Sequence, residues 1–209
     1  MVRITFEGVD LKFGGKEVFR SLEADMRSGS VTVVTGRNGS GKSTFLRLAA
    51  RILPPDRGRV TAEEAGKPLE REEYRSRIAM LSPEMKLYPR LTAEENLRFL
   101  AGLRGKTLHG DAVTDLWERV GLASSEVGEV FAGQLSTGMR QRVKFALLLA
   151  SEAEVWMLDE PCANLDAGGT QMLMEEARRA ASGGKLVLWA TNAREEEEIG
   201  DEVIRLSGD

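Results

Sequence analysis

The chain contains a single cysteine, Cys162, among its 209 residues. One thiol cannot form an internal disulfide, which excludes the disulfide framework of many small secreted domains. Long apolar runs are also lacking. The longest, residues 145–150, is far shorter than the roughly 18 residues that a membrane-spanning helix needs. The N-terminus carries charge at once and has no apolar signal segment. We therefore expect a soluble, cytosolic chain, so that any work at a membrane requires a partner that supplies the spans.

An excess of basic residues is likewise absent, because the net charge at pH 7 is -4 and the sequence pI is near 5.4. That balance argues against general binding to nucleic acid or to an anionic membrane surface. Histidine is scarce too, with His109 the only one. What the composition provides is 42% hydrophobic residues, enough for one sizeable core with a small lobe attached.

Hydrophobic patterning predicts strands that alternate with helices. Residues 31–35 are a β-branched run typical of a buried strand, and residues 42–52 indicate a helix that ends before Pro54. Thr92 followed by Glu95 forms a capping box, which marks the start of a helical stretch. This order predicts a mostly parallel sheet with helices on both faces. Helices are also expected at 139–150 and 168–181, strands within 1–35 and at 155–158, 186–190 and 203–206, and a solvated acidic helix face at 195–198.

A glycine-rich segment directly follows the strand at 31–35. Residues 36–44 read GRNGSGKST, the pattern G-x-x-x-x-G-K-[ST] of a phosphate-binding loop between a strand and a helix. Its glycines let the backbone curl so that successive N–H groups point at one anion, and the following helix adds partial positive charge. We expect Lys42 to reach the β- and γ-phosphates of ATP and Ser43 to bind Mg²⁺. The predicted nucleotide-binding residues are Gly36, Asn38, Gly39, Ser40, Gly41, Lys42, Ser43 and Thr44.

Two acids end the apolar strand at 155–158. In a sheet of parallel strands the carboxyl ends form the ligand crevice, so both side chains are expected near the phosphate loop. Asp159 there could hold Mg²⁺, directly or through water. Glu160 could polarise an attacking water, which makes it the candidate catalytic base.

Further segments resemble the ATP-binding cassette (ABC) proteins. Residues 135–139 (LSTGM) resemble the LSGGQ signature of that family, in a form that leans towards exporters, and residues 163–166 (ANLD) resemble its D-loop. Phe13 stands where the family places an aromatic ring that stacks on adenine. The resemblance implies an α/β fold: a P-loop NTPase core with a mostly parallel sheet, an N-terminal antiparallel β subdomain and a small inserted helical subdomain. It also implies one cassette domain over residues 1–209, with the core lobe in 1–83 and 151–209 and the helical subdomain and signature helix in 84–150.

In the family this chain resembles, two cassettes pair head to tail. By that resemblance, Ser136 and Gly138 hold the γ-phosphate of the ATP bound to the partner cassette, and Asp166 belongs to the same nucleotide interface. A hydroxyl and a bare backbone amide at a helix start also form an anion site on physical grounds. The implied function is an ATP-binding and ATP-hydrolysing subunit that powers a separate membrane permease. The chain would then be cytoplasmic and would reach the inner face of the membrane only through that permease.

Two residues that the family usually has are missing here. Asn192 stands in place of a histidine after the last core strand, and His109 lies in the predicted helical stretch, where it cannot substitute. An asparagine still donates a hydrogen bond to a phosphate oxygen but carries no charge. Pro83 or Glu84 stands in place of a glutamine, and Glu84 would bind Mg²⁺ as a hard oxygen donor. We therefore hypothesise slow hydrolysis that relies on Glu160.

Two alternatives stay open beside the transporter subunit. One is a soluble cassette ATPase that drives assembly of another complex. The other is a nucleotide-gated switch with negligible hydrolysis.

Overall fold

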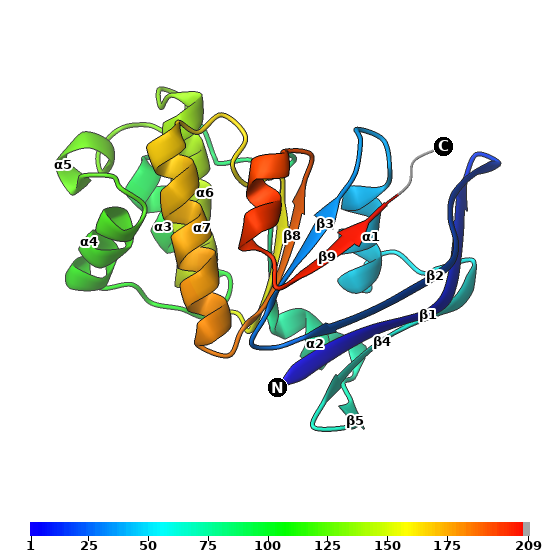
Figure 1. The fold of residues 1–209 in the computed structure, drawn as a ribbon. Helices are drawn as coiled ribbons and strands as arrows, with labels where there is room; N and C mark the ends of the chain where they lie inside the picture. The colour runs from blue at the N-terminus through cyan, green and yellow to red at the C-terminus, as the bar shows by residue number, and fades with distance from the viewer. Residues whose placement is uncertain (207–209) are drawn as a thin grey trace. The chain divides into compact units, whose positions relative to one another are not determined.

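The computed structural model describes residues 1–206, which form two compact units (Figure 1). Unit 1 comprises Met1–Met80, Ala153–Glu160 and residues 177–206, and unit 2 comprises Leu81–Glu152 and Pro161–Glu176. The span of residues 84–150 for the helical subdomain and signature helix stays a prediction.

Unit 1 begins with an antiparallel sheet. Its strands are β1 (Val2–Phe13), β2 (Lys16–Arg27), β4 (Arg57–Glu64) and β5 (Lys67–Pro68), in the order β2-β1-β4-β5. Alternate residues of β1 are buried, as expected for a strand that packs one face on a core. From that face Phe6 stacks on Phe45 of helix α1 (Lys42–Ala49), with the ring centroids 4.6 Å apart. The antiparallel sheet therefore packs directly on the helix that follows the phosphate loop.

The second sheet of unit 1 has the strand order β6-β7-β8-β3-β9. The strands are β3 (Val31–Thr35), β6 (Ile78–Leu81), β7 (Val155–Asp159), β8 (Leu186–Thr191) and β9 (Glu202–Arg205). Every residue of β3, β7 and β8 is buried, which is typical of parallel strands covered on both faces. β8 runs parallel to β3 and to β7, so the carboxyl ends of these three strands lie at one edge of the sheet.

Between β8 and β9 lies a short 3-10 helix, η1 (Arg194–Ile199), and between β5 and β6 lies α2 (Arg71–Ser76). The acidic run 195–198 falls in η1, where we expected a solvated face. Glu195 and Glu198 are exposed, as predicted. The prediction is wrong for Glu196, which is only 8% exposed. The tight helical turn directs Glu196 inward, next to the end of β8.

Unit 2 consists mainly of helices. They are α3 (Ala93–Gly102), α4 (Gly110–Arg119), α5 (Ser124–Val127), α6 (Thr137–Ala150) and the first part of α7 (Ala167–Ser182). α6 packs against α3 and α4. The predicted capping box is confirmed, because Thr92 Oγ1 accepts a hydrogen bond from the Glu95 N–H and the Glu95 carboxylate accepts one from the Thr92 N–H. Within residues 1–206 no helix is long and apolar enough to cross a membrane.

Candidate functional site: a phosphate loop with two acids and an asparagine pair

The phosphate loop connects β3 to α1 in unit 1, as predicted. Gly41 directly precedes α1 with φ 96°, and a Cβ there would lie 2.8 Å from a methyl carbon of Val18. Both observations require glycine at this position. α1 has no side-chain cap and no acidic residue in its first turn. The partial positive charge at its start is therefore available to an anion.

Lys42 is buried at the start of α1, with 6% of its surface exposed. Its Nζ donates to the carbonyl oxygen of Gly36 at 3.0 Å and lies 3.3 Å from Oε1 of Glu160. The loop thus folds around its own lysine. Ser43, one residue further on, is exposed.

Of the two acids, Asp159 is the last residue of β7 and Glu160 directly follows it, and their environments differ. Asp159 is 6% exposed, and within the described chain its buried Oδ1 has no hydrogen-bond partner. Glu160 is half-buried, adopts a left-handed φ of 48°, and donates its N–H to the carbonyl oxygen of Ala190 at 2.9 Å. A non-glycine residue with positive φ is uncommon and is often found at functional sites. The turn brings the Glu160 carboxylate to Lys42.

Asn192 follows β8, and its exposed side chain reaches the phosphate loop. Its Nδ2 donates to Oδ1 of Asn38 at 2.8 Å. The register of the parallel pair accounts for this contact, because Thr35 lies opposite Thr191 at the ends of β3 and β8. Asn38 and Asn192 were both predicted site residues, but their pairing was not, since it depends on which strands are neighbours.

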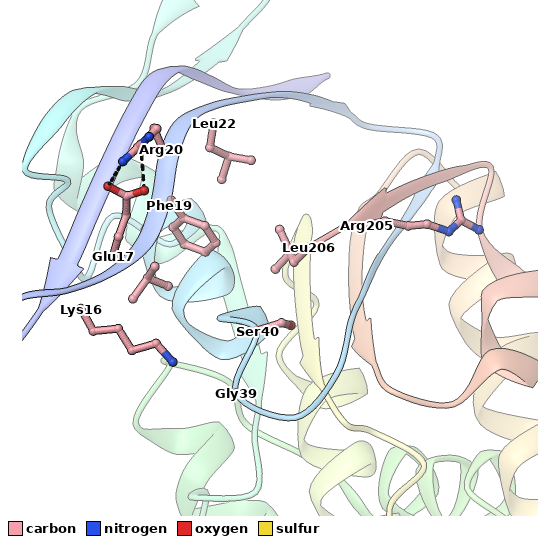
Figure 2. Close-up of a pocket in the computed structure, with 10 residues that line it drawn as sticks. Lys16, Glu17, Phe19, Arg20, Leu22, Gly39, Ser40, Arg205 and Leu206 are labelled. Carbon is pink, nitrogen blue, oxygen red and sulfur yellow. Dashed lines mark hydrogen bonds and ion pairs between the residues drawn. The ribbon is translucent and has the colours of Figure 1, made fainter. Parts of the chain in front are cut away.

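A cavity of about 310 Å³ lies beside the loop, between β2 and the end of β9 (Figure 2). Phe19 and Leu206 supply apolar walls, while Gly39 and Ser40 contribute the loop side. Phe13, the predicted adenine-stacking residue, does not line this cavity. It is 51% exposed at the end of β1, where a planar base has open access to its ring.

The predicted signature residues lie in unit 2. Ser136 is the N-cap of α6, and its Oγ accepts a hydrogen bond from the Met139 N–H at 3.1 Å. Gly138 lies in the first turn of that helix, and a Cβ on it would lie 3.1 Å from the carbonyl oxygen of Asn164. Sequence reasoning missed Gln141, whose buried Nε2 donates to the carbonyl oxygen of Pro161 at 2.6 Å and so ties α6 to the segment after Glu160.

Two further predicted residues of unit 2 occupy loops. The Oδ1 of Asp166 accepts from the Gly169 N–H at 2.8 Å and pairs with Arg142 at 3.1 Å. The Gly169 N–H, with Arg142 as a smaller influence, lowers the pKa of Asp166. This local capping role was not expected. Glu84 lies exposed in the turn after β6, and its part in binding Mg²⁺ stays a prediction.

Comparison with protein families gives one match, to the model of the ABC transporter family over residues 19–163. Among curated proteins, the Cytochrome c biogenesis ATP-binding export protein CcmA of Haemophilus influenzae is 32% identical, covering 89% of this chain and 87% of that protein. CcmA of Mesorhizobium japonicum is 35% identical, covering 91% and 92%. The Daunorubicin resistance ATP-binding protein DrrA3 of Streptomyces coeruleorubidus is 34% identical, covering 92% of this chain and 61% of that protein.

Solved structures give the same fold at lower identity. A putative ABC transporter ATP-binding protein from Pyrococcus furiosus matches with a TM-score of 0.84 and 22% identity, covering 98% of this chain and 97% of that one. The dimeric structure of the bacterial ABC transporter cassette MJ0796 matches with a TM-score of 0.82 and 22% identity, covering 97% and 94%. At such identity these structures establish the fold alone.

Proposed function

This chain belongs to the ABC transporter family as an ATP-binding, ATP-hydrolysing subunit that powers a separate permease, and we propose that hydrolysis takes place at the phosphate loop of unit 1. The observation that carries this proposal is the convergence of Lys42, Glu160 and Asn192 on that loop. A cation, a carboxylate and a neutral hydrogen-bond donor at one helix start are the groups that phosphoryl transfer to water needs.

ATP would bind with its phosphates at the start of α1. Backbone N–H groups and the helix dipole provide the anion site there, and Lys42 supplies the full positive charge. We propose that Phe13 stacks on the adenine, because its ring is open to solvent at the end of β1. The Lys42 ammonium would then leave its ion pair with Glu160 and bind the phosphates, which would free the Glu160 carboxylate.

The chemistry of the residues also fits a magnesium ion. The buried Asp159 Oδ1 has no partner within residues 1–206, and Ser43 presents a hydroxyl at the helix start. Mg²⁺ is commonly held by one or two such protein oxygens together with substrate phosphates, where it neutralises the developing charge. We propose Asp159 and Ser43 as its ligands, with Glu84 as a further oxygen donor.

Glu160 is the proposed general base. Its carboxylate would accept a proton from the attacking water, a role that typically contributes about 10²–10⁴-fold to a rate. Asn192 would donate a hydrogen bond to the γ-phosphate. Because an amide supplies no charge, we expect turnover to be slow.

A second cassette would complete the site. The Ser136 hydroxyl accepts the capping bond from Met139, which leaves its own hydrogen free to donate to a phosphate oxygen. Gly138 adds a backbone amide without a side chain. We propose that these groups of one chain bind the ATP held by the phosphate loop of the other, with Asp166 holding the adjoining loop in place.

Unit 2 also carries a surface suited to a permease. Tyr88 and Phe99 form an edge-to-face pair with centroids 5.3 Å apart, and both rings are substantially exposed, as are Leu103 and Phe131. A groove of about 470 Å³ with Met85 and Leu87 in its walls belongs to the same unit. Exposed apolar side chains that gather on one surface mark protein interaction sites, and the Tyr88–Phe99 pair is such a contact. We propose that the permease docks here, and the name of the relative CcmA, an ATP-binding export protein, favours export as the direction of transport.

Phosphate release from MgATP by the purified chain, measured beside a Glu160→Gln variant, tests the proposed site. We expect turnover that rises more than linearly with protein concentration and that disappears in the variant. Glu72→Gln, at an exposed position in the first turn of α2, is the matched control and should retain full turnover. Equal turnover of the parent and Glu160→Gln would refute Glu160 as base. ATP binding without any turnover would favour the nucleotide-gated switch.

A further inference from the structure

A buried carboxylate follows Asn192 within the acidic run of η1. Glu196 is 8% exposed, whereas Glu195 and Glu198 on the same short helix are exposed. Burying a carboxylate is costly unless it is hydrogen-bonded. Its burial on a helix with two exposed glutamates therefore indicates a specific set of partners.

Those partners lie in β8, just before Asn192. The indole Nε1 of Trp189 donates to Oε2 of Glu196 at 2.7 Å, and the hydroxyl of Thr191 also bonds to that carboxylate. Thr191 Oγ1 in turn accepts from the Ala193 N–H at 3.0 Å. Trp189 and Thr191 are fully buried. The carboxylate thus binds the end of β8, and the Thr191 hydroxyl links it to the backbone of Ala193, on the far side of Asn192.

The next glutamate ties the same helix to the neighbouring strand. Glu197 accepts from Thr35 Oγ1 at 3.0 Å and pairs with Arg205 at 2.7 Å. Thr35 is the last residue of β3, immediately before the phosphate loop, and it lies opposite Thr191 in register. η1 therefore fastens both strand ends whose loops meet in the Asn38–Asn192 hydrogen bond.

We propose that Glu196 is a positioning residue, which holds the segment 191–193 so that Asn192 faces the phosphate loop. The catalytic part of this inference rests on the proposed role of Asn192, while the structural part does not. Burial raises the pKa of Glu196, and the charges of Glu160 and Glu195 act in the same direction, whereas the bonds from Trp189 and Thr191 oppose it. Those two bonds are what hold a carboxylate in this place.

The first test observes the asparagine directly in the nucleotide-free full chain. The side-chain amide resonances of Asn192 are assigned by their loss in Asn192→Asp. We expect Glu196→Ala to move them and to speed their solvent exchange, while Glu196→Gln, which keeps an acceptor for Trp189, has a smaller effect. Glu195→Ala, an exposed neighbour, should leave them in place. Unmoved resonances in Glu196→Ala would overturn the proposal, whether or not the chain hydrolyses ATP.

The second test asks whether Glu196 acts through Asn192. Because small misplacements of a positioned group can cost up to about 100-fold, we expect Glu196→Ala to lower kcat about 10-fold, with the Kd for ATP changing less than about twofold. In an Asn192→Ala background the same change should have no further effect on kcat. If Glu196→Ala lowered kcat equally in the parent and in the Asn192→Ala background, the proposal would be overturned. It would also be overturned if kcat and ATP affinity of Glu196→Ala fell only in proportion to the fraction of the variant that is unfolded.

Thr191→Val provides a variant of nearly equal shape if Glu196→Ala folds poorly. It removes the hydroxyl that links Glu196 to Ala193, so we expect the same change in the Asn192 resonances. Failure of the proposed hydrolytic function would appear differently, as equal turnover of the parent and Glu160→Gln. The two proposals are therefore judged by separate measurements.

Discussion

The ammonium of Lys42 lies 3.3 Å from the Glu160 carboxylate and 3.0 Å from the carbonyl oxygen of Gly36. The cation that should bind phosphate is therefore paired with the group that should activate water. On the proposed mechanism, a bound triphosphate would compete with Glu160 for that cation, so that nucleotide binding would release the proposed base. The pairing also gives the buried lysine charged and polar partners, which offset the cost of burying its charge.

Replacing the lysine should separate binding from the other functions of the loop. We expect Lys42→Met to weaken ATP binding by about 10- to 100-fold, the equivalent of one lost charge-assisted hydrogen bond. Titration with a fluorescent ATP analogue measures this Kd. Lys67→Met, on the exposed strand β5, is the control and should bind as the parent does. Unchanged affinity of Lys42→Met would place the phosphates elsewhere.

A histidine at position 192 tests the hypothesis that Asn192 makes turnover slow. An imidazolium at position 192 would add a positive charge near the γ-phosphate, where Asn192 offers only an amide. We expect Asn192→His to raise kcat by up to about 10-fold, most strongly below the ordinary histidine pKa of about 6.5. Asn192→Gln, which lengthens the amide without charge, should give no gain. A histidine variant no faster than the parent would contradict the hypothesis.

Much of the candidate site was accessible from the sequence because its parts are local. The loop 36–44 matches the phosphate-loop pattern by itself. Asp159 and Glu160 come at the end of an apolar strand, and the carboxyl ends of parallel strands share one edge of the sheet. The capping box at Thr92 needs only two residues at a fixed spacing. Such features depend on neighbours in sequence, so the pattern alone predicts them.

The parts that were missed depend on contacts between segments far apart in the chain. Asn38 and Asn192 are 154 residues apart, and they meet because β3 and β8 are adjacent in register. The sequence predicts a solvated face for Glu196 because it lies among other glutamates. In the fold it is buried, and Trp189 donates a hydrogen bond to its carboxylate. Residue type predicts such side chains poorly, since tertiary partners decide whether a charge is buried.

The capping contact of Asp166 gives a separate prediction for unit 2. Asn caps helices about as well as Asp, so Asp166→Asn should retain the bond from Gly169 and lose only the ion pair with Arg142. We expect Asp166→Ala to lower both Tm and ATP turnover, and Asp166→Asn to stay near the parent in both. If Asp166→Asn lost turnover as fully as Asp166→Ala at unchanged Tm, the carboxylate itself would be required and the capping role would be incidental.

Acid stability should respond to one cross-strand cluster in unit 1. Arg3 holds both oxygens of Asp25 at 2.7 Å, and Arg27 adds a further pair, which together lower the pKa of Asp25 well below its ordinary value of 3.8. A lowered pKa in the folded state stabilises the fold above the ordinary pKa, and this contribution is lost as the pH falls through the folded value.

Asp25→Asn should therefore have a lower Tm than the parent at pH 7, and the difference should shrink as the pH falls below about 3.8. Thermal unfolding followed by circular dichroism between pH 7 and pH 2.5 measures both curves. Asp115→Asn, at an exposed position in α4, is the control and should follow the parent throughout. A Tm difference independent of pH would mean that Asp25 stabilises the β1–β2 pair through its shape and hydrogen bonds rather than through its charge.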